Sequence, residues 1–208
     1  LPYRTLPLEV KYNLASYRTC LDCKYGVERL KQSQITYSAW KVEWAGLSAL
    51  LKTSIHLMRE KDAKSCLPDV LKKELRDAWN ELLSNKSQYP LFWEFIHRER
   101  NNIMKEYEFS AYEAIIKPDG TSRRPRGLLS FMEDGEKETL LIGSGYYKDR
   151  QALEVLSEAT QWVENYIFLV IHKAGFDPDE KRYAGSLLPI PPAPVSARNT
   201  LLGDLLAK

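Results

Sequence analysis

The segment FWEFIHRERNNIMKEYEF, residues 92–109, carries side chains that could bind a phosphate group and move a proton. Guanidinium and ammonium groups bind phosphate oxygens, and an imidazole exchanges protons near neutral pH. Residues three or four positions apart lie on the same side of a helix. The segment therefore predicts a helix with a polar, mainly cationic row along one side, formed by His97, Arg100, Asn101 and Lys105.

Arg100 is unusual because a helical projection at about 100° per residue places it within the apolar stripe of this helix. Phe92, Ile96, Ile103 and Tyr107 flank it on one side of the projection, and Trp93 and Met104 flank it on the other. A buried guanidinium without a counter-charge is strongly destabilising. Arg100 therefore needs an acidic partner, a cleft that water reaches, or a second subunit.

Two interpretations of Arg100 follow from the residues alone. In the structural one, Arg100 pairs with a carboxylate and locks the helix packing, with Tyr107 beside it as a core aromatic residue. The candidate carboxylates are Glu43, Glu74 and Glu164. In the functional one, Arg100 and Lys105 line a cleft that a ligand can enter.

Residues RNNIMKEY, 100–107, resemble the active motif of HEPN domains (higher eukaryote and prokaryote nucleotide-binding domains). That motif is an arginine, four residues, a histidine, one residue and a tyrosine. Arg100 and Tyr107 match its spacing, and Asn101 fits the polar residue that commonly follows the arginine. Lys105 occupies the position of the family's histidine. The resemblance covers the helical part of the chain, about residues 8–112 and the last helix.

The resemblance implies an all-α bundle and, for many members, a metal-independent ribonuclease that acts as a homodimer with two motifs across a cleft. It implies that Arg100 binds the scissile phosphate, while the family's histidine moves protons as the 2′-hydroxyl attacks. Lys105, with an ordinary pKa of about 10.4, is a poor general base but could hold a phosphate or donate a proton. His97 could supply the imidazole from a shifted position, although a helix-edge histidine without a role is the simpler interpretation.

The resemblance therefore predicts an RNA- or nucleotide-directed protein of a bacterial defence or toxin–antitoxin system, with metal-independent endoribonuclease activity if it is catalytic. Lys105 in place of the histidine counts against catalysis. The alternative is a non-catalytic helical module that recruits a protein partner through its C-terminal arm. A ribonuclease-like protein should have Arg100 and Lys105 in a cleft. A protein-interaction module should instead have Arg100 in an ion pair with a carboxylate inside the protein.

A basic loop, KPDGTSRRPRG at residues 117–127, could extend a phosphate-binding surface through Arg123, Arg124 and Arg126. Clustered arginines bind phosphates well, although a run of this kind is usually a solvated turn. The sequence contains no Walker loop, no Rossmann glycine pattern and no H-E-x-x-H motif. We therefore expect neither a cofactor nor a metal ion.

Apolar periodicity predicts the helices that must position these residues. They span about 8–32, 36–62, 67–85, 90–112 and 149–174, with Leu21 and Leu50 among the apolar positions of the first two. Two apolar runs around EDGEKE predict a β-hairpin near residues 127–147. The predicted fold is mainly α, an antiparallel bundle of four or five helices with a small β-hairpin insertion. We expect this domain over residues 1–175 and a Pro-rich arm with a short amphipathic tail over 176–208.

The composition is that of an ordinary globular protein, with 44% hydrophobic and 28% charged residues and a net charge of +2. The longest apolar run, YIFLVI at 166–171, is far shorter than the ~20 residues of a membrane span. The odd count of three cysteines argues against a disulfide scaffold and indicates a reducing, cytoplasmic setting. Cys20 and Cys23 lack a second ligand pair, so we interpret them as core or surface thiols rather than a zinc site.

Overall fold

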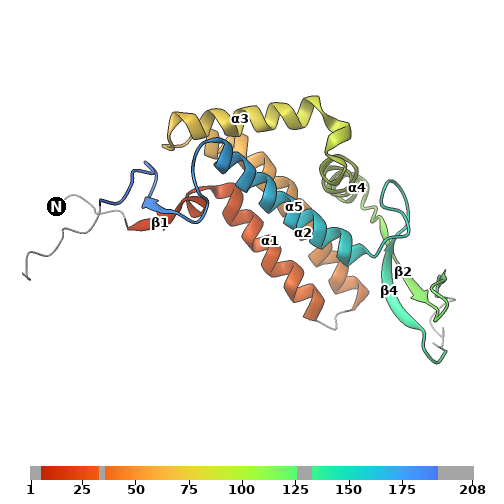
Figure 1. Ribbon diagram of the computed structural model, residues 1–208. Coiled ribbons are helices and arrows are strands. Elements are labelled where there is room, and N and C mark those ends of the chain that lie inside the picture. The colour runs from red at the N-terminus through yellow and green to blue at the C-terminus, as the bar shows by residue number, and fades with distance from the viewer. Residues whose placement is uncertain (1–5, 33–35, 126–132, 192–208) are drawn as a thin grey trace, which may run out of the picture.

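The computed structural model describes residues 6–32, 36–125 and 133–191. Within these ranges the chain is mainly helical, which confirms the predicted fold class (Figure 1). The α-helices are α1 (Ala15–Gln32), α2 (Tyr37–Glu60), α3 (Asp69–Ser84), α4 (Arg98–Glu106) and α5 (Ala152–Lys173). A π-helix, η4 (Leu91–His97), leads directly into α4. Short 3-10 turns are η1 (Val10–Asn13), η2 (Asp62–Lys64) and η3 (Lys86–Gln88).

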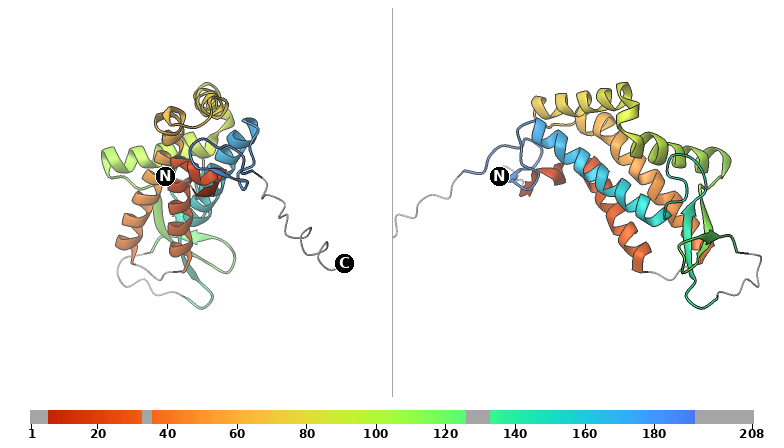
Figure 2. Two further views of the ribbon diagram at one scale, coloured as in Figure 1. Left: turned by 90° about the vertical axis from the view of Figure 1, so that its left-hand side faces the viewer. Right: turned by 45° about the vertical axis from the view of Figure 1, so that its right-hand side comes forward.

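Three long helices form the body of the bundle. Helix α1 packs against both α2 and α5, and α3 lies beside α5 and α2 along one edge (Figures 1 and 2). Thr36 caps α2, because its side-chain oxygen accepts a hydrogen bond from the backbone N–H of Ala39 at 3.3 Å. Of the helices described, none offers a stretch of sufficient length and hydropathy to cross a bilayer.

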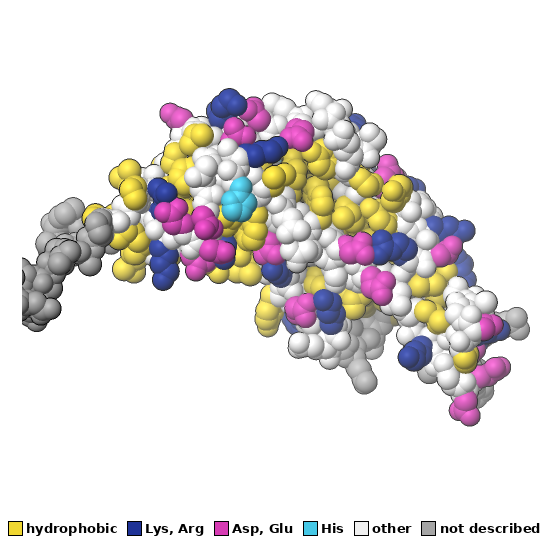
Figure 3. Space-filling model, in the orientation of Figure 1, with side chains coloured by type: hydrophobic (Ala, Val, Ile, Leu, Met, Phe, Trp, Pro, Cys, Tyr) yellow, Lys and Arg dark blue, Asp and Glu magenta, His cyan; other side chains and the backbone are white. Residues whose placement is uncertain are grey.

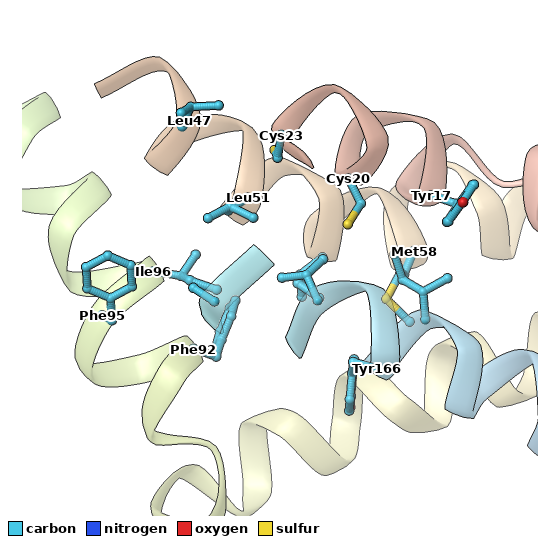
Figure 4. Packing of buried hydrophobic residues seen from close by; sticks show 14 of the residues in the cluster. Tyr17, Cys20, Cys23, Leu47, Leu51, Met58, Phe92, Phe95, Ile96 and Tyr166 are labelled. Carbon is cyan, nitrogen blue, oxygen red and sulfur yellow. The ribbon is translucent and has the colours of Figure 1, made fainter. Parts of the chain in front are cut away.

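The hydrophobic core lies between α1, α2, α5 and η4, whose buried side chains turn toward one another in Figure 4. Cys20 and Cys23 are completely buried there. Burial raises the pKa of the Cys20 thiol to about 12 and also raises that of Cys23, so both stay protonated at neutral pH. They are core thiols. Leu21 and Leu50 are exposed instead, which corrects their assignment to the apolar faces of α1 and α2.

The N-terminal helix begins later than predicted. Strand β1 (Pro7–Glu9) and turn η1 precede it, and β1 pairs antiparallel with β5 (Lys181–Tyr183). This pairing joins residues far apart in the sequence, so local periodicity could not predict it. It also places the described part of the segment 176–208 beside the N-terminal segment. The rest of the predicted Pro-rich arm and its amphipathic tail, 192–208, lie outside the described residues.

The helix predicted over 90–112 ends at Glu106, because Tyr107 adopts a left-handed conformation with φ 55°. The N–H groups of Tyr107 and Glu108 bond back to the carbonyls of Ile103 and Asn102 at 3.1 and 3.3 Å. Such bonds from a left-handed residue satisfy the free carbonyls of a helix end. The chain then leaves the helix and enters a β-strand.

A small antiparallel sheet includes the second part of the segment predicted as a β-hairpin. Strand β2 (Ala111–Ile116) lies between β3 (Ser122–Arg123) and β4 (Lys137–Ile142). Strand β4 is the second apolar run of the prediction. It pairs with β2, whose first two residues overlap the end of the helix predicted over 90–112. The first run, around residues 127–132, lies outside the described residues. The sheet extends from one end of the bundle (Figure 1).

Charged side chains of both signs are interspersed over the face of the molecule shown in Figure 3. This distribution agrees with the net charge of only +2. A functional cluster of side chains with the same charge must therefore be confined to a small part of the surface. Such a cluster is identified from the contacts of individual side chains.

Candidate functional site

Arg100 lies at the edge of the buried face of η4 and α4 and not in its middle. The side chains that η4 and α4 bury most deeply are Phe92, Phe95, Ile96, Glu99 and Ile103. Arg100 is partly buried beside them. Its predicted central position is therefore wrong.

The helical projection misplaced Arg100 for two physical reasons. It counted Met104 and Tyr107 as part of the apolar stripe, but their side chains are 53% and 72% exposed. Tyr107 also lies beyond the helix end, and its ring centroid is 5.3 Å from that of Phe109. It is therefore not a core aromatic residue. In addition, residues 91–97 form a π-helix. Its wider turn changes the rotation between successive residues, so a projection at 100° per residue does not apply there. Such turns are frequent at functional sites.

Asn101 joins three charged or titratable side chains. Its Oδ1 accepts hydrogen bonds from Lys52 Nζ at 3.0 Å and from an Nη1 hydrogen of Arg100 at 3.3 Å. Its Nδ2 lies 2.9 Å from His97 Nε2. Ammonium and guanidinium groups only donate, so the amide oxygen must face them and the amide nitrogen must donate to His97. His97 Nε2 is then an acceptor, and the imidazole is neutral.

The electrostatic surroundings of this group are positive. The pKa of His97 is lowered, first by burial and then by the charges of Lys52, Lys86, Arg100 and Lys105. The pKa of Lys52 is lowered by burial and then by Arg100 and Lys105. We call the residues Lys52, His97, Arg100, Asn101 and Lys105 the Asn101 cluster.

Among the described residues, no carboxylate forms an ion pair with a cation of the Asn101 cluster. The acidic partners considered for Arg100 are occupied by other cations. Glu43 pairs with Arg29 and Glu164 with Lys24, while Glu74 lies 3.8 Å from Lys73.

Glu99, although adjacent to Arg100 in sequence, serves a different part of the core. Its Oε1 accepts hydrogen bonds from Trp44 Nε1 at 2.6 Å and from the backbone N–H of Ser110 at 3.2 Å. Within the described part of the chain, the Arg100 guanidinium therefore has no ion-paired carboxylate of the kind that a purely structural arginine requires.

An aromatic side chain borders the cluster. The Trp93 and His97 ring centroids are 4.9 Å apart, and Lys86 Nζ lies 4.6 Å from the Trp93 ring centroid. Trp93 Nε1 donates to the carbonyl of Leu82 at 3.0 Å, which fixes the ring at the end of α3. Lys86 thereby adds a further exposed positive charge beside the cluster.

The structure brings together four of the five residues predicted as catalytic. His97, Arg100 and Asn101 are joined by hydrogen bonds, and Lys105 is an exposed residue one turn further along α4. Lys105 also contributes to the lowered pKa values of Lys52 and His97. Tyr107 is exposed at the helix end and packs on Phe109, and no contact joins it to the cluster among the described residues.

The basic loop does not present three free arginines. Arg123 donates to both carboxylate oxygens of the buried Glu136, at 3.0 and 2.7 Å, and so holds the end of the sheet together. The Arg124 guanidinium carbon lies 4.7 Å from the ring centroid of Tyr112. Arg126 lies outside the described residues.

Lys52 and Lys86 are the members of the site region that the sequence did not single out. Lys52 lies in the middle of α2, at a position that periodicity assigns to an ordinary solvent-facing lysine, and Lys86 lies in the short turn η3. Only the packing of α2 and η3 around α4 and η4 brings them to Asn101 and Trp93. A partly buried set of cations around one amide is an arrangement that can receive an anion.

The chain was compared with models of protein families, with curated proteins and with solved structures, and none of these comparisons found a match. The resemblance to HEPN domains therefore stays a prediction that rests on Arg100, Asn101 and Tyr107.

Proposed function

We propose that the Asn101 cluster binds a phosphate group of RNA or of a nucleotide, and that the protein is HEPN-like in function. One observation carries this proposal: the partly buried Lys52 and Arg100 meet at Asn101, near the exposed Lys105, without an ion-paired carboxylate among the described residues. Like charges held together in this way destabilise the folded protein. A bound phosphate would remove that repulsion.

Each cation suits a different part of phosphate binding. The planar guanidinium of Arg100 can donate two parallel hydrogen bonds to phosphate oxygens. Lys52 and Lys105 act as point charges, and Asn101 orients Lys52 and Arg100 through its hydrogen bonds to them. Trp93, at the edge of the cluster, offers an aromatic surface near an RNA base. The homodimer and the bacterial defence role remain part of this proposal through the resemblance.

If the protein cleaves RNA, His97 is the candidate general base, because a protonated Lys105 can donate a proton but cannot accept one. The 2′-hydroxyl would attack the phosphorus while its proton passes to His97 Nε2, the atom that accepts from Asn101. The bond to the 5′-oxygen would break, and that oxygen would take a proton from Lys105. The products are a 2′,3′-cyclic phosphate and a 5′-hydroxyl end. The lowered pKa of His97 keeps it neutral and able to accept a proton at pH 7.

The proposal is tested by the binding of a fluorescent single-stranded RNA to the Arg100→Ala variant, measured by anisotropy at several salt concentrations. We expect the affinity for RNA to fall at least about tenfold. The slope of the logarithm of the binding constant against the logarithm of the salt concentration should become smaller in magnitude by about one. Arg98→Ala is the matched control, because Arg98 is exposed on the same helix and its Nη1 lies 3.8 Å from Glu94 Oε2. Equal affinity of wild type and Arg100→Ala would refute the proposal.

Cleavage is measured separately, in EDTA, with analysis of the RNA ends. Metal-independent cleavage that is lost in His97→Gln, with RNA binding retained, would assign the proton transfer to His97. Binding without cleavage would make the protein an RNA binder with an inactive motif. If RNA does not bind to the folded protein, the protein-interaction module becomes the better description.

A further inference from the structure

A cavity of about 490 Å³ lies where the β2–β4 sheet meets the end of α1 and the beginnings of α2 and α5. Its size suits a small organic molecule. The lining residues on which its chemistry depends are Leu30, Tyr37, Trp40, Glu113, Glu138 and Leu153. None of these belongs to the Asn101 cluster, so the cavity is a separate feature of the molecule.

The β-sheet register directs two carboxylates to the same side. In the β2–β4 pair, Glu113 is opposite Leu140 and Glu138 is opposite Ile115. Opposite residues share a face, so Glu113 and Glu138 are diagonal neighbours on one face of the sheet. Ile142 on that face belongs to the hydrophobic core, which identifies it as the face toward the bundle. Apolar side chains are expected on such a face, and Glu113 departs from that rule because it is half-buried there, whereas Glu138 is exposed.

Neither glutamate has an ion pair or a hydrogen-bond partner among the described residues. The nearby Tyr37 hydroxyl donates to the carbonyl of Ala111 at 3.1 Å and is therefore engaged elsewhere. Burial and the charge of Glu113 raise the pKa of Tyr37, in agreement with an unneutralised carboxylate close to that ring. Like charges at neighbouring sheet positions destabilise the pairing. The site would therefore gain from a positive group between the two carboxylates.

We propose that this cavity binds an organic cation, an amine or guanidinium group carried on an apolar stem. The cationic head would form ion pairs with Glu113 and Glu138 at the sheet. The stem would contact the apolar wall of Leu30, Trp40 and Leu153. The described residues include no group of three or more His, Cys, Asp or Glu side chains placed to hold a metal ion, which favours an organic cation.

The test uses the full 208-residue chain and isothermal titration calorimetry with two probes that differ only in charge. 4-Phenylbutylamine carries the ammonium head, and 4-phenylbutan-1-ol carries a neutral head on the same stem. We expect saturable binding of the amine and at least about tenfold weaker binding of the alcohol. This comparison needs no variant, so it does not depend on how a substitution folds.

Charge-removing variants then locate the site. Glu113→Gln and Glu138→Gln should each weaken amine binding at least about fivefold, because each removes one ion pair. Their thermal stability should not fall, since each also removes a like-charge contact. Glu108→Gln is the matched control, because Glu108 is an exposed glutamate that does not line the cavity.

Several results would overturn the proposal. These are a failure of the amine to saturate, equal affinities for amine and alcohol, or unchanged binding by both glutamate variants. Tighter binding of Ca²⁺ than of the amine, lost in the same variants, would identify a metal site instead. The RNA experiments are independent of this result, because the two sites have no residue in common.

Discussion

Lys52 on α2 and Asn101 on α4 meet through a hydrogen bond of 3.0 Å across 49 positions of sequence. The bond places an ammonium group beside the guanidinium of Arg100, which donates to the same amide oxygen. Two cations on one acceptor are costly in a folded protein unless an anion joins them. This relationship is the centre of the proposed phosphate site.

The first prediction concerns the energetic cost of Lys52. Its lowered pKa shows that its charge is less favourable in the folded protein than in water. Lys52→Met should therefore keep or raise the free energy of unfolding while it weakens RNA binding. Urea unfolding and anisotropy with the same RNA measure the two effects. This combination is typical of a residue retained for function.

Lys24→Met provides the matched control, because Lys24 Nζ lies 2.8 Å from both oxygens of the buried Glu164. Its removal leaves that carboxylate without its cation and should lower the free energy of unfolding by about 1 to 3 kcal/mol. RNA affinity should stay the same. If Lys52→Met were as destabilising as Lys24→Met, Lys52 would be a structural residue.

The second prediction concerns His97 and pH. Its pKa in the folded protein lies below the about 6.5 of an unfolded histidine. The unfolded state therefore binds the proton first as pH falls, and the free energy of unfolding decreases from about pH 6.5 down to the folded pKa. Above that window the contribution of His97 to stability is fully present.

The check is to measure urea unfolding of wild type and His97→Gln between pH 7.5 and 5. Wild type should lose more stability than the variant over this range, since only wild type has the titrating imidazole. Added phosphate, by NMR titration of the imidazole, should raise the pKa of His97, because an anion offsets Lys52, Lys86, Arg100 and Lys105. The prediction is wrong if the free energy of unfolding changes equally with pH in wild type and His97→Gln. A pKa of His97 that phosphate does not change would contradict the placement of His97 at a phosphate site.

The third prediction concerns Glu99, the buried acid next to Arg100. Glu99→Ala would leave the Trp44 indole N–H and the Ser110 backbone N–H without their acceptor. We expect a loss of about 2 to 3 kcal/mol in the free energy of unfolding. Glu106→Ala, an exposed change on the same helix, should have little effect. A similar loss in both variants would show that Glu99 matters only for helix stability.

The fourth prediction concerns Asp62, which caps α1 from η2. Its two oxygens accept the backbone N–H groups of Ala15 and Ser16 at 2.8 and 3.0 Å. Asp62→Ala should cost about 2 to 3 kcal/mol, because two buried donors at a helix N-terminus lose their partner. Asp69→Ala, an exposed change in the first turn of α3, is the control. Thermal unfolding of both variants makes the comparison, and equal melting temperatures would contradict this role.

The sequence by itself determined the helical class and most of the helix positions, because the periodicity of buried residues such as Leu51, Ile55 and Val163 is a local property. It also identified the polar row of η4 and α4, since residues three and four apart share a side of a helix. The choice of Arg100, Asn101, His97 and Lys105 as a group needed no knowledge of the rest of the fold.

Tertiary structure decided which side of that helix is buried and what surrounds the row. Glu99 faces Trp44 inside, Arg100 lies at the edge, and Tyr107 leaves the helix in a left-handed turn. The β1–β5 and β2–β4 pairings, like the approach of Lys52 to Asn101, join residues distant in sequence. Such contacts depend on how whole elements pack, and no local pattern specifies them.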